Sequence, residues 1–143
     1  MRLLAVVFVA TLVPTSAFAQ GEAWERADRP PEATSYIISP SHGEVVSSPF
    51  TVKFGLQGMG VAPAGVDYPD TGHHHLAINR DVKKFDEPLV SGEPDLLHFG
   101  GGQTEASIVL EPGEYTLQMV LGDLDHVPHD PPVMSGKVTI TVR

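Results

Sequence analysis

Three consecutive histidines, His73, His74 and His75, are the residues of this 143-residue chain whose types and spacing best suit chemistry. Neutral imidazole is the commonest metal ligand in proteins, and its pKa near ~6.5 also makes it a proton switch. The triplet lies inside the chain and leads directly into the apolar residues 76–78, so it is not a terminal expression tag. This pattern predicts a strand that begins with imidazoles.

Alternation along that strand would separate the three rings. Successive side chains of a strand point to opposite faces of the sheet. His74 would then lie on the side of Leu76 and Ile78, facing the core, where it is the candidate most easily explained as a buried, hydrogen-bonded structural residue. His73 and His75 would share the other face, and two histidines spaced in this way can reach the same metal ion.

Three further histidines can complete a site. His98 ends a short expected strand, and His126 and His129 flank Val127-Pro128 in a later loop. The proline stiffens this loop, which lowers the entropy cost of ordering it around a ligand. The candidate metal ligands are therefore His73, His75, His98, His126 and His129, with His74 as a sixth.

The donor atoms favour a transition metal. Histidines with nearby carboxylates and no thiolate suit Cu(II), Zn(II) or Ni(II), so copper or zinc is the expected cofactor. Met59 and Met134 lie in the neighbouring loops and can either add a soft ligand for Cu(I) or simply pack. The aspartates at 67, 70, 123, 125 and 130 could instead form an oxygen site for Ca²⁺. This site is less well supported, because the spacing of these aspartates matches no EF-hand loop.

The elements that must position these residues have the pattern of β-strands. Apolar and polar residues alternate most clearly at 50–56, 104–110, 114–121 and 137–142, with shorter runs at 36–38, 74–79 and 96–99. Tyr115 follows a Pro-Gly turn, as in the tyrosine corner of sandwich domains. About seven short strands predict an all-β fold, an immunoglobulin-like antiparallel β-sandwich over residues 35–143.

The order of these strands would bring the histidines together. Because successive strands reverse direction, the loops before residue 74, after residue 99 and after residue 121 are expected at the same end of the sandwich. His42 lies in the turn after the first strand and is expected at the opposite end. Six of the seven histidines would thus converge.

The chain begins as secretory signal peptides do. Arg2 is followed by an apolar run and by Ala17-Phe18-Ala19, which fits an A-x-A cleavage site. The run is shorter than the ~20 residues that span a bilayer. Residues 1–19 are therefore expected to be a signal peptide that is cleaved near Ala19. The mature protein would be periplasmic or secreted, without membrane insertion, and residues 20–34 would form a flexible leader.

Composition narrows the classes of function. The formal net charge of −9 becomes −10 once Arg2 is removed, and this acidity argues against nucleic acid as a partner. The chain has no cysteine, and its serines lie in no nucleophile-elbow context, so hydrolase activity is not indicated. A likeness to copper–zinc superoxide dismutase is limited to histidines on a β-strand.

Two interpretations stay open. In the first, the histidine cluster binds, buffers or delivers a metal ion. In the second, the same end of the molecule is a metal-free module of the cell envelope that binds an envelope protein or another ligand. The few aromatic residues expected there, Tyr68 and Phe99, favour the first interpretation, because interface hot spots are usually richer in aromatic residues.

Five sequence blocks are distinctive when taken together: SPFTVKFG at 48–55, GMGVAPAG at 58–65, TGHHHL at 71–76, HFGGGQTE at 98–105, and LGD at 121–123 followed by HVPHDPP at 126–132. The likeness that they carry covers nearly all of the chain from Ser39 on. This pattern resembles a secreted bacterial family catalogued as domain of unknown function 4399. The family carries no established activity, so the resemblance supports the expected fold and compartment more than a function.

Overall fold

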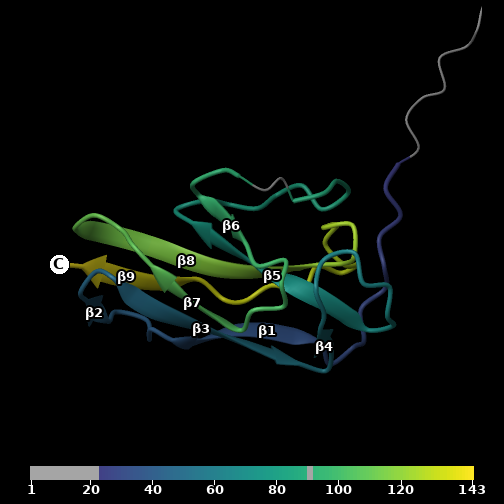
Figure 1. The fold of residues 1–143 in the computed structure, drawn as a ribbon, viewed down its shortest axis with the longest axis horizontal. Coiled ribbons are helices and arrows are strands. Elements are labelled where there is room, and N and C mark those ends of the chain that lie inside the picture. Colours follow the sequence, from purple (N-terminus) through teal and green to yellow (C-terminus); the bar gives the residue numbers. More distant parts are fainter. Residues whose placement is uncertain (1–22, 90–91) are drawn as a thin grey trace, which may run out of the picture.

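A computed structural model describes residues 23–89 and 92–143; the expected signal peptide, residues 1–19, lies outside the described residues. Across these two ranges the chain forms strands and no helix, and so no helix that could span a membrane (Figure 1). The strands are β1 (Thr34–Ser39), β2 (Val45–Val46), β3 (Phe50–Gln57), β4 (Gly60–Val61), β5 (Thr71–Ile78), β6 (Leu96–His98), β7 (Glu105–Ile108), β8 (Gly113–Gly122) and β9 (Val138–Val142).

The strands form two sheets. The smaller sheet has the order β1-β3-β7, and the larger has the order β2-β9-β8-β5-β4, with β6 also pairing with β5. The pairs β2–β9 and β4–β5 are parallel, and the other pairs are antiparallel. The prediction of an all-β fold is confirmed. Seven of the strands correspond to the expected runs, and the two-residue strands β2 and β4 are additions that the sequence pattern does not reveal.

The main core is built by the expected alternation. Along β3, Phe50, Val52 and Phe54 are buried while Thr51 and Lys53 are exposed. These side chains pack against residues of the larger sheet, and each large apolar side chain that is removed from water contributes ~1.5–3 kcal/mol. The buried members of this core are Phe50, Val52, Phe54, Leu76, Ile78, Phe99, Ile108, Leu117, Met119, Ile140 and Val142.

Strand β5 is covered on both faces, whereas alternation alone suggests a half-buried strand. All of its residues from Gly72 to Ile78 are buried. Its outer face, away from the smaller sheet, carries a second apolar cluster of Ala77, Leu89, Leu96 and Val120. The reason is that the segment between β5 and β6 folds back over the sheet, where the Leu89 amide donates to the His126 carbonyl at 2.9 Å.

Three loops meet beside the beginning of β5. The Ala64 amide donates to the Gly100 carbonyl, and the Gly65 amide donates to the Leu124 carbonyl, both at 2.9 Å. The loops before β5, after β6 and after β8 are therefore in contact, as the strand order predicts.

The described part of the expected flexible leader contacts the body of the protein. The Arg26 guanidinium donates to the carbonyls of Pro128, at 3.0 Å, and His129. Asp130 and Ala27 are joined by a backbone hydrogen bond of 2.9 Å. Ala33, which is 1% exposed, belongs to a third apolar cluster and is not outside the core. The sequence pattern misses this because the contacts are made by backbone groups, by one arginine and by the small side chain of Ala33.

Candidate metal centre

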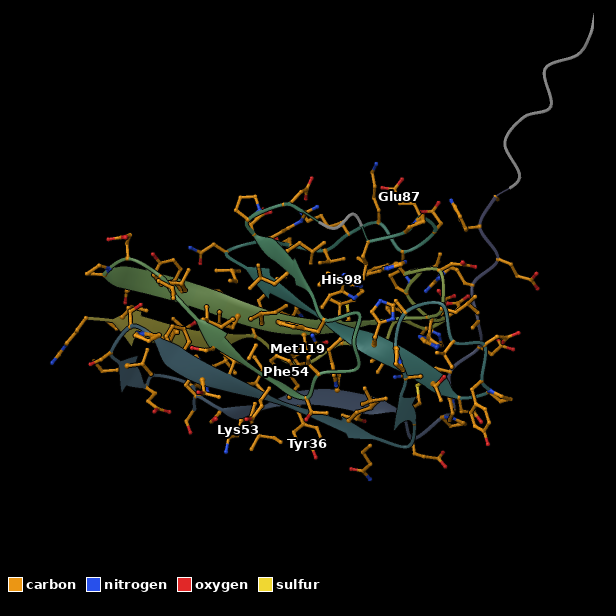
Figure 2. All side chains as sticks on the ribbon, in the orientation of Figure 1. Tyr36, Lys53, Phe54, Glu87, His98 and Met119 are labelled. Carbon is orange, nitrogen blue, oxygen red and sulfur yellow. The ribbon has the colours of Figure 1, made fainter. Side chains whose placement is uncertain are left out.

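Four histidine rings from three parts of the chain meet on the outer face of the larger sheet. His73 and His75 come from β5, His98 from the end of β6 and His126 from the loop after β8. The centroid of the His73 ring lies 4.8 Å from His75, 5.0 Å from His98 and 4.8 Å from His126. The remaining separations are 5.1 Å for His75–His98, 4.8 Å for His98–His126 and 6.0 Å for His75–His126. Figure 2 labels His98 on the opposite side of the sheet from Phe54 and Met119 of the core.

The strand register explains why three of these side chains share a face. His75 is directly opposite His98 in the β5–β6 ladder, and directly opposed residues project to the same side of a sheet. His73 stands two residues before His75 on β5 and therefore lies on that side as well. The predicted pairing of His73 with His75 on one face thus agrees with the structure.

Two glycines leave the space that the rings occupy. A Cβ atom on Gly122 would lie 2.9 Å from Cε1 of His75, and one on Gly100 would lie 2.5 Å from Nε2 of His98. Atoms do not approach this closely, so a side chain at either position would displace an imidazole. Sequence reasoning missed both glycines as parts of the site, because only the folded structure shows which rings they face.

A tight turn after β8 places His126. Oδ1 of Asp123 accepts hydrogen bonds from the amides of Asp125 and Val127, both at 2.9 Å. The His126 amide also donates to the Asp123 carbonyl, at 3.1 Å. His126 has a φ of +71°, in the left-handed region, where a residue other than glycine costs of order ~1–3 kcal/mol. The turn stabilises this conformation, so Asp123 positions a candidate ligand and need not be a calcium ligand itself.

Burial keeps the inner rings neutral. The side chains of His73 and His75 are both 0% exposed. Loss of solvation, the largest cause, acts together with the neighbouring histidines to lower the pKa of His73 to about 4 and that of His75 to about 3. The pKa of His98 is lowered mainly by burial and then by His126. These rings therefore offer lone pairs to a cation at neutral pH without first losing a proton.

The ring nitrogens of the cluster have unsatisfied hydrogen-bonding capacity. Both nitrogens of His73 and of His75, and Nε2 of His98, are buried without a hydrogen-bond partner among the described residues. Each such group costs ~1–3 kcal/mol when it is removed from water and left unpaired. A metal ion would coordinate one nitrogen of each ring and so offset part of that cost.

Three of the rings are arranged so that one ion can reach them. One nitrogen each from His73, His98 and His126 lies within 4.8 Å of the other two. Nitrogens around a tetrahedral zinc ion with bonds of ~2.0–2.1 Å are ~3.4 Å apart, so shifts on the order of 1 Å would close the site. His75 packs against this triad and supplies a fourth imidazole.

Two of the six predicted ligands lie away from the cluster. His74 faces the core and packs on Phe54, with a ring separation of 5.3 Å. It is buried as predicted, but the prediction that it is hydrogen-bonded is wrong, because neither ring nitrogen has a partner among the described residues. His129 is buried beside Arg26, Asp123 and Asp70. Its departure follows from the bridge between Gly122 and Pro128, which returns the chain to the sheet just before residue 129.

The two methionines considered as ligands, and His42, contact parts of the protein other than the histidine cluster. Met59 and Met134 pack at the edges of two apolar clusters. His42, expected at the opposite end, accepts a hydrogen bond of 3.2 Å from the Thr139 amide.

Comparison with known protein families gives a match to this chain. The sequence profile of one family, described as a domain of unknown function (DUF4399), matches residues 52–143. The chain belongs to this family. The match confirms the resemblance noted from the sequence blocks, and its range contains all four clustered histidines of this DUF4399 protein. Neither the curated proteins nor the solved structures give a match to the DUF4399 chain.

Proposed function

We propose that this DUF4399 protein binds one transition metal ion, copper or zinc, through His73, His75, His98 and His126. The single observation that carries the proposal is the convergence of four imidazoles, among which both nitrogens of His73 and His75 and Nε2 of His98 are buried without a hydrogen-bond partner among the described residues. Imidazole is a preferred ligand of both metals.

The electrostatics of the chain support the same function. The inner rings are neutral at pH 7, so binding a cation does not require the release of a proton from them. The formal net charge of −9 also attracts cations toward the protein as a whole. His98 and His126 are half-buried, so two of the four rings are partly exposed to solvent.

We also propose that binding takes place outside the cytoplasm, in the periplasm or after secretion. The support is the sequence of residues 1–19, which has the charged start, apolar run and cleavage motif of a signal peptide. In that compartment a reversible histidine site would buffer a metal or deliver it to another protein of the envelope.

Metal titration of the mature protein, prepared without a tag or chelating resin, tests the proposal. We expect one equivalent of Zn(II) or Cu(II) to bind, and we expect His73→Ala and His126→Ala to weaken binding by at least ~100-fold, since even outer-shell partners of metal ligands are worth 10–100-fold. His42→Ala is the control and should bind as tightly as the unmodified protein. Equal affinity in all variants would overturn the proposal.

A second candidate function is recognition of an envelope protein or another ligand by the same end of the molecule, without metal. Its support is the set of exposed apolar side chains on the loops near the cluster: Val66 is 43% exposed, Tyr68 69% and Leu124 37%. Two results together would favour this alternative. The titration would show no metal binding, and the protein would bind an envelope protein or another ligand in a way that Tyr68→Ala abolishes.

A further inference from the structure

We infer that the four-histidine cluster is shaped for a tetrahedral ion and selects Zn(II) over Cu(II). This inference rests on the proposed function and names the ion that the site prefers. It follows from the shape of the cluster, its size and the rigidity of the strand that carries half of it.

The six ring separations exclude a planar arrangement. With His73–His98 at 5.0 Å as one diagonal, the four sides of the quadrilateral measure 4.8, 5.1, 4.8 and 4.8 Å. If the centroids lay in one plane, as around a square-planar ion, His75 and His126 would be ~8.4 Å apart. Their separation is 6.0 Å. The four rings therefore stand at the corners of a distorted tetrahedron.

The size of this tetrahedron suits a zinc ion. A point equidistant from the corners of a tetrahedron with edges of about 5.1 Å, the mean of the six separations, lies about 3.1 Å from each corner. A zinc–nitrogen bond of ~2.0–2.1 Å plus about 1.1 Å from the nitrogen to the ring centre gives ~3.2 Å. The ring centres are thus already near coordination distance, and shifts on the order of 1 Å together with side-chain rotations would aim one nitrogen of each ring at the centre.

The cluster has little freedom to flatten. His73 and His75 lie on β5, which pairs with β8 on one side and with β4 and β6 on the other, and both side chains are fully buried. The His75 ring fills the space beside Gly122, where a Cβ atom would lie 2.9 Å from its Cε1. With β5 held in the packed sheet, only the half-buried His98 and His126 could move toward a planar arrangement.

This rigidity affects the two ions differently. In sites with free geometry Cu(II) binds more tightly than Zn(II), but Cu(II) favours tetragonal coordination, whereas Zn(II) has no geometric preference from its d electrons. A tetrahedral site therefore removes much of the advantage of Cu(II). Cu(I) favours thiolate and thioether ligands, which this all-nitrogen donor set does not provide.

Cobalt substitution, and competition between Zn(II) and Cu(II), test the inference on the mature protein. Co(II) absorbs strongly in the visible region when it is tetrahedral and weakly when it is octahedral. We expect an intense visible band that one equivalent of Zn(II) abolishes, and we expect Cu(II) to bind more weakly than Zn(II) in a competition with a common chelator. Electron paramagnetic resonance of the Cu(II) form should show a tetrahedrally distorted site.

His75→Ala supplies the matched comparison. It leaves three imidazoles and an open position, so Zn(II) affinity should fall by at least ~100-fold while Cu(II) regains its usual advantage. A weak cobalt band and displacement of Zn(II) by Cu(II) in the unmodified protein would overturn the selectivity while leaving metal binding intact. If none of the three ions binds, the proposed function itself fails.

Discussion

Gly100 contributes to the candidate metal centre because it has no side chain. The His98 ring occupies the space where a side chain at position 100 would begin. Asp123 contributes through its carboxylate, which accepts two backbone hydrogen bonds and sets the turn that contains His126. Neither residue needs to touch the ion, yet each fixes the position of one candidate ligand.

We predict that Gly100→Ala weakens metal binding with little change in backbone conformation. The added methyl group would meet Nε2 of His98 at 2.5 Å and push the ring away from the other three. Gly136→Ala is a matched control, because a Cβ there meets no described atom within 4 Å. Calorimetric titration with Zn(II) should show a loss of ~10-fold or more for the first variant only; equal losses would contradict this role.

Asp123→Ala should both destabilise the protein and weaken metal binding. It removes two hydrogen bonds to a carboxylate, one buried and one partly buried, which together contribute ~1–3 kcal/mol to the free energy of unfolding. Asp123→Asn keeps an oxygen acceptor and should lose less of both. Urea unfolding and Zn(II) titration of the two variants measure the effects. A variant with lower stability but unchanged affinity would show that the turn does not position His126.

At the scale of the elements, β5 shows both the reach and the limit of reasoning from sequence. Its alternation was sufficient to assign His73 and His75 to one face and His74 to the other, because that periodicity is local. The strand order was sufficient to bring the three loops together. Burial of β5 on both faces was not predictable, because it depends on how the segment after it folds back.

Dependence on the whole fold also explains why the position of His129 and the roles of two glycines could not be predicted from the sequence. His126 and His129 are close in sequence, and a loop drawn without register gives both an equal chance to reach the site. The bridge from Gly122 to Pro128 and the contacts of Arg26 separate them, and these involve residues far apart in the chain. The roles of Gly100 and Gly122 likewise depend on which rings lie beside them in the fold.

At the scale of the whole molecule, the buried neutral rings make stability depend on pH. The pKa values of His73 and His75 are about 4 and 3 in the folded protein but ~6.5 when unfolded. Below pH ~6.5 the unfolded chain therefore binds more protons than the folded one. The free energy of unfolding should fall as the pH decreases, by up to ~1.4 kcal/mol per pH unit for each ring.

Urea unfolding of the metal-free protein at pH 7.5, 6.5, 5.8 and 5.2 checks this dependence. We expect a constant midpoint above pH ~6.5 and a progressive decrease below it, before carboxylates with pKa values of ~4 contribute. A midpoint that stays constant down to pH 5.2 would show that these rings take up protons in the folded state.

Bound metal should raise the melting temperature. An ion that binds the folded state alone contributes about 2.7 kcal/mol at a free concentration of one hundred times its dissociation constant. For a domain of this size the shift is on the order of 10 °C. Differential scanning calorimetry with and without Zn(II) measures it, with His73→Ala as the variant in which the shift should disappear.

The placement of the four histidines also gives this cysteine-free chain a removable cross-link. His73 and His126 stand on either side of the whole stretch from β6 through β8, so an ion held by both would close that stretch into a ring. A permanent cross-link around a loop of this length restricts the unfolded chain by roughly 4 kcal/mol in the chain-entropy account. A disulfide gives a secreted protein this constraint permanently, whereas here the supply of metal would decide whether the cross-link is present.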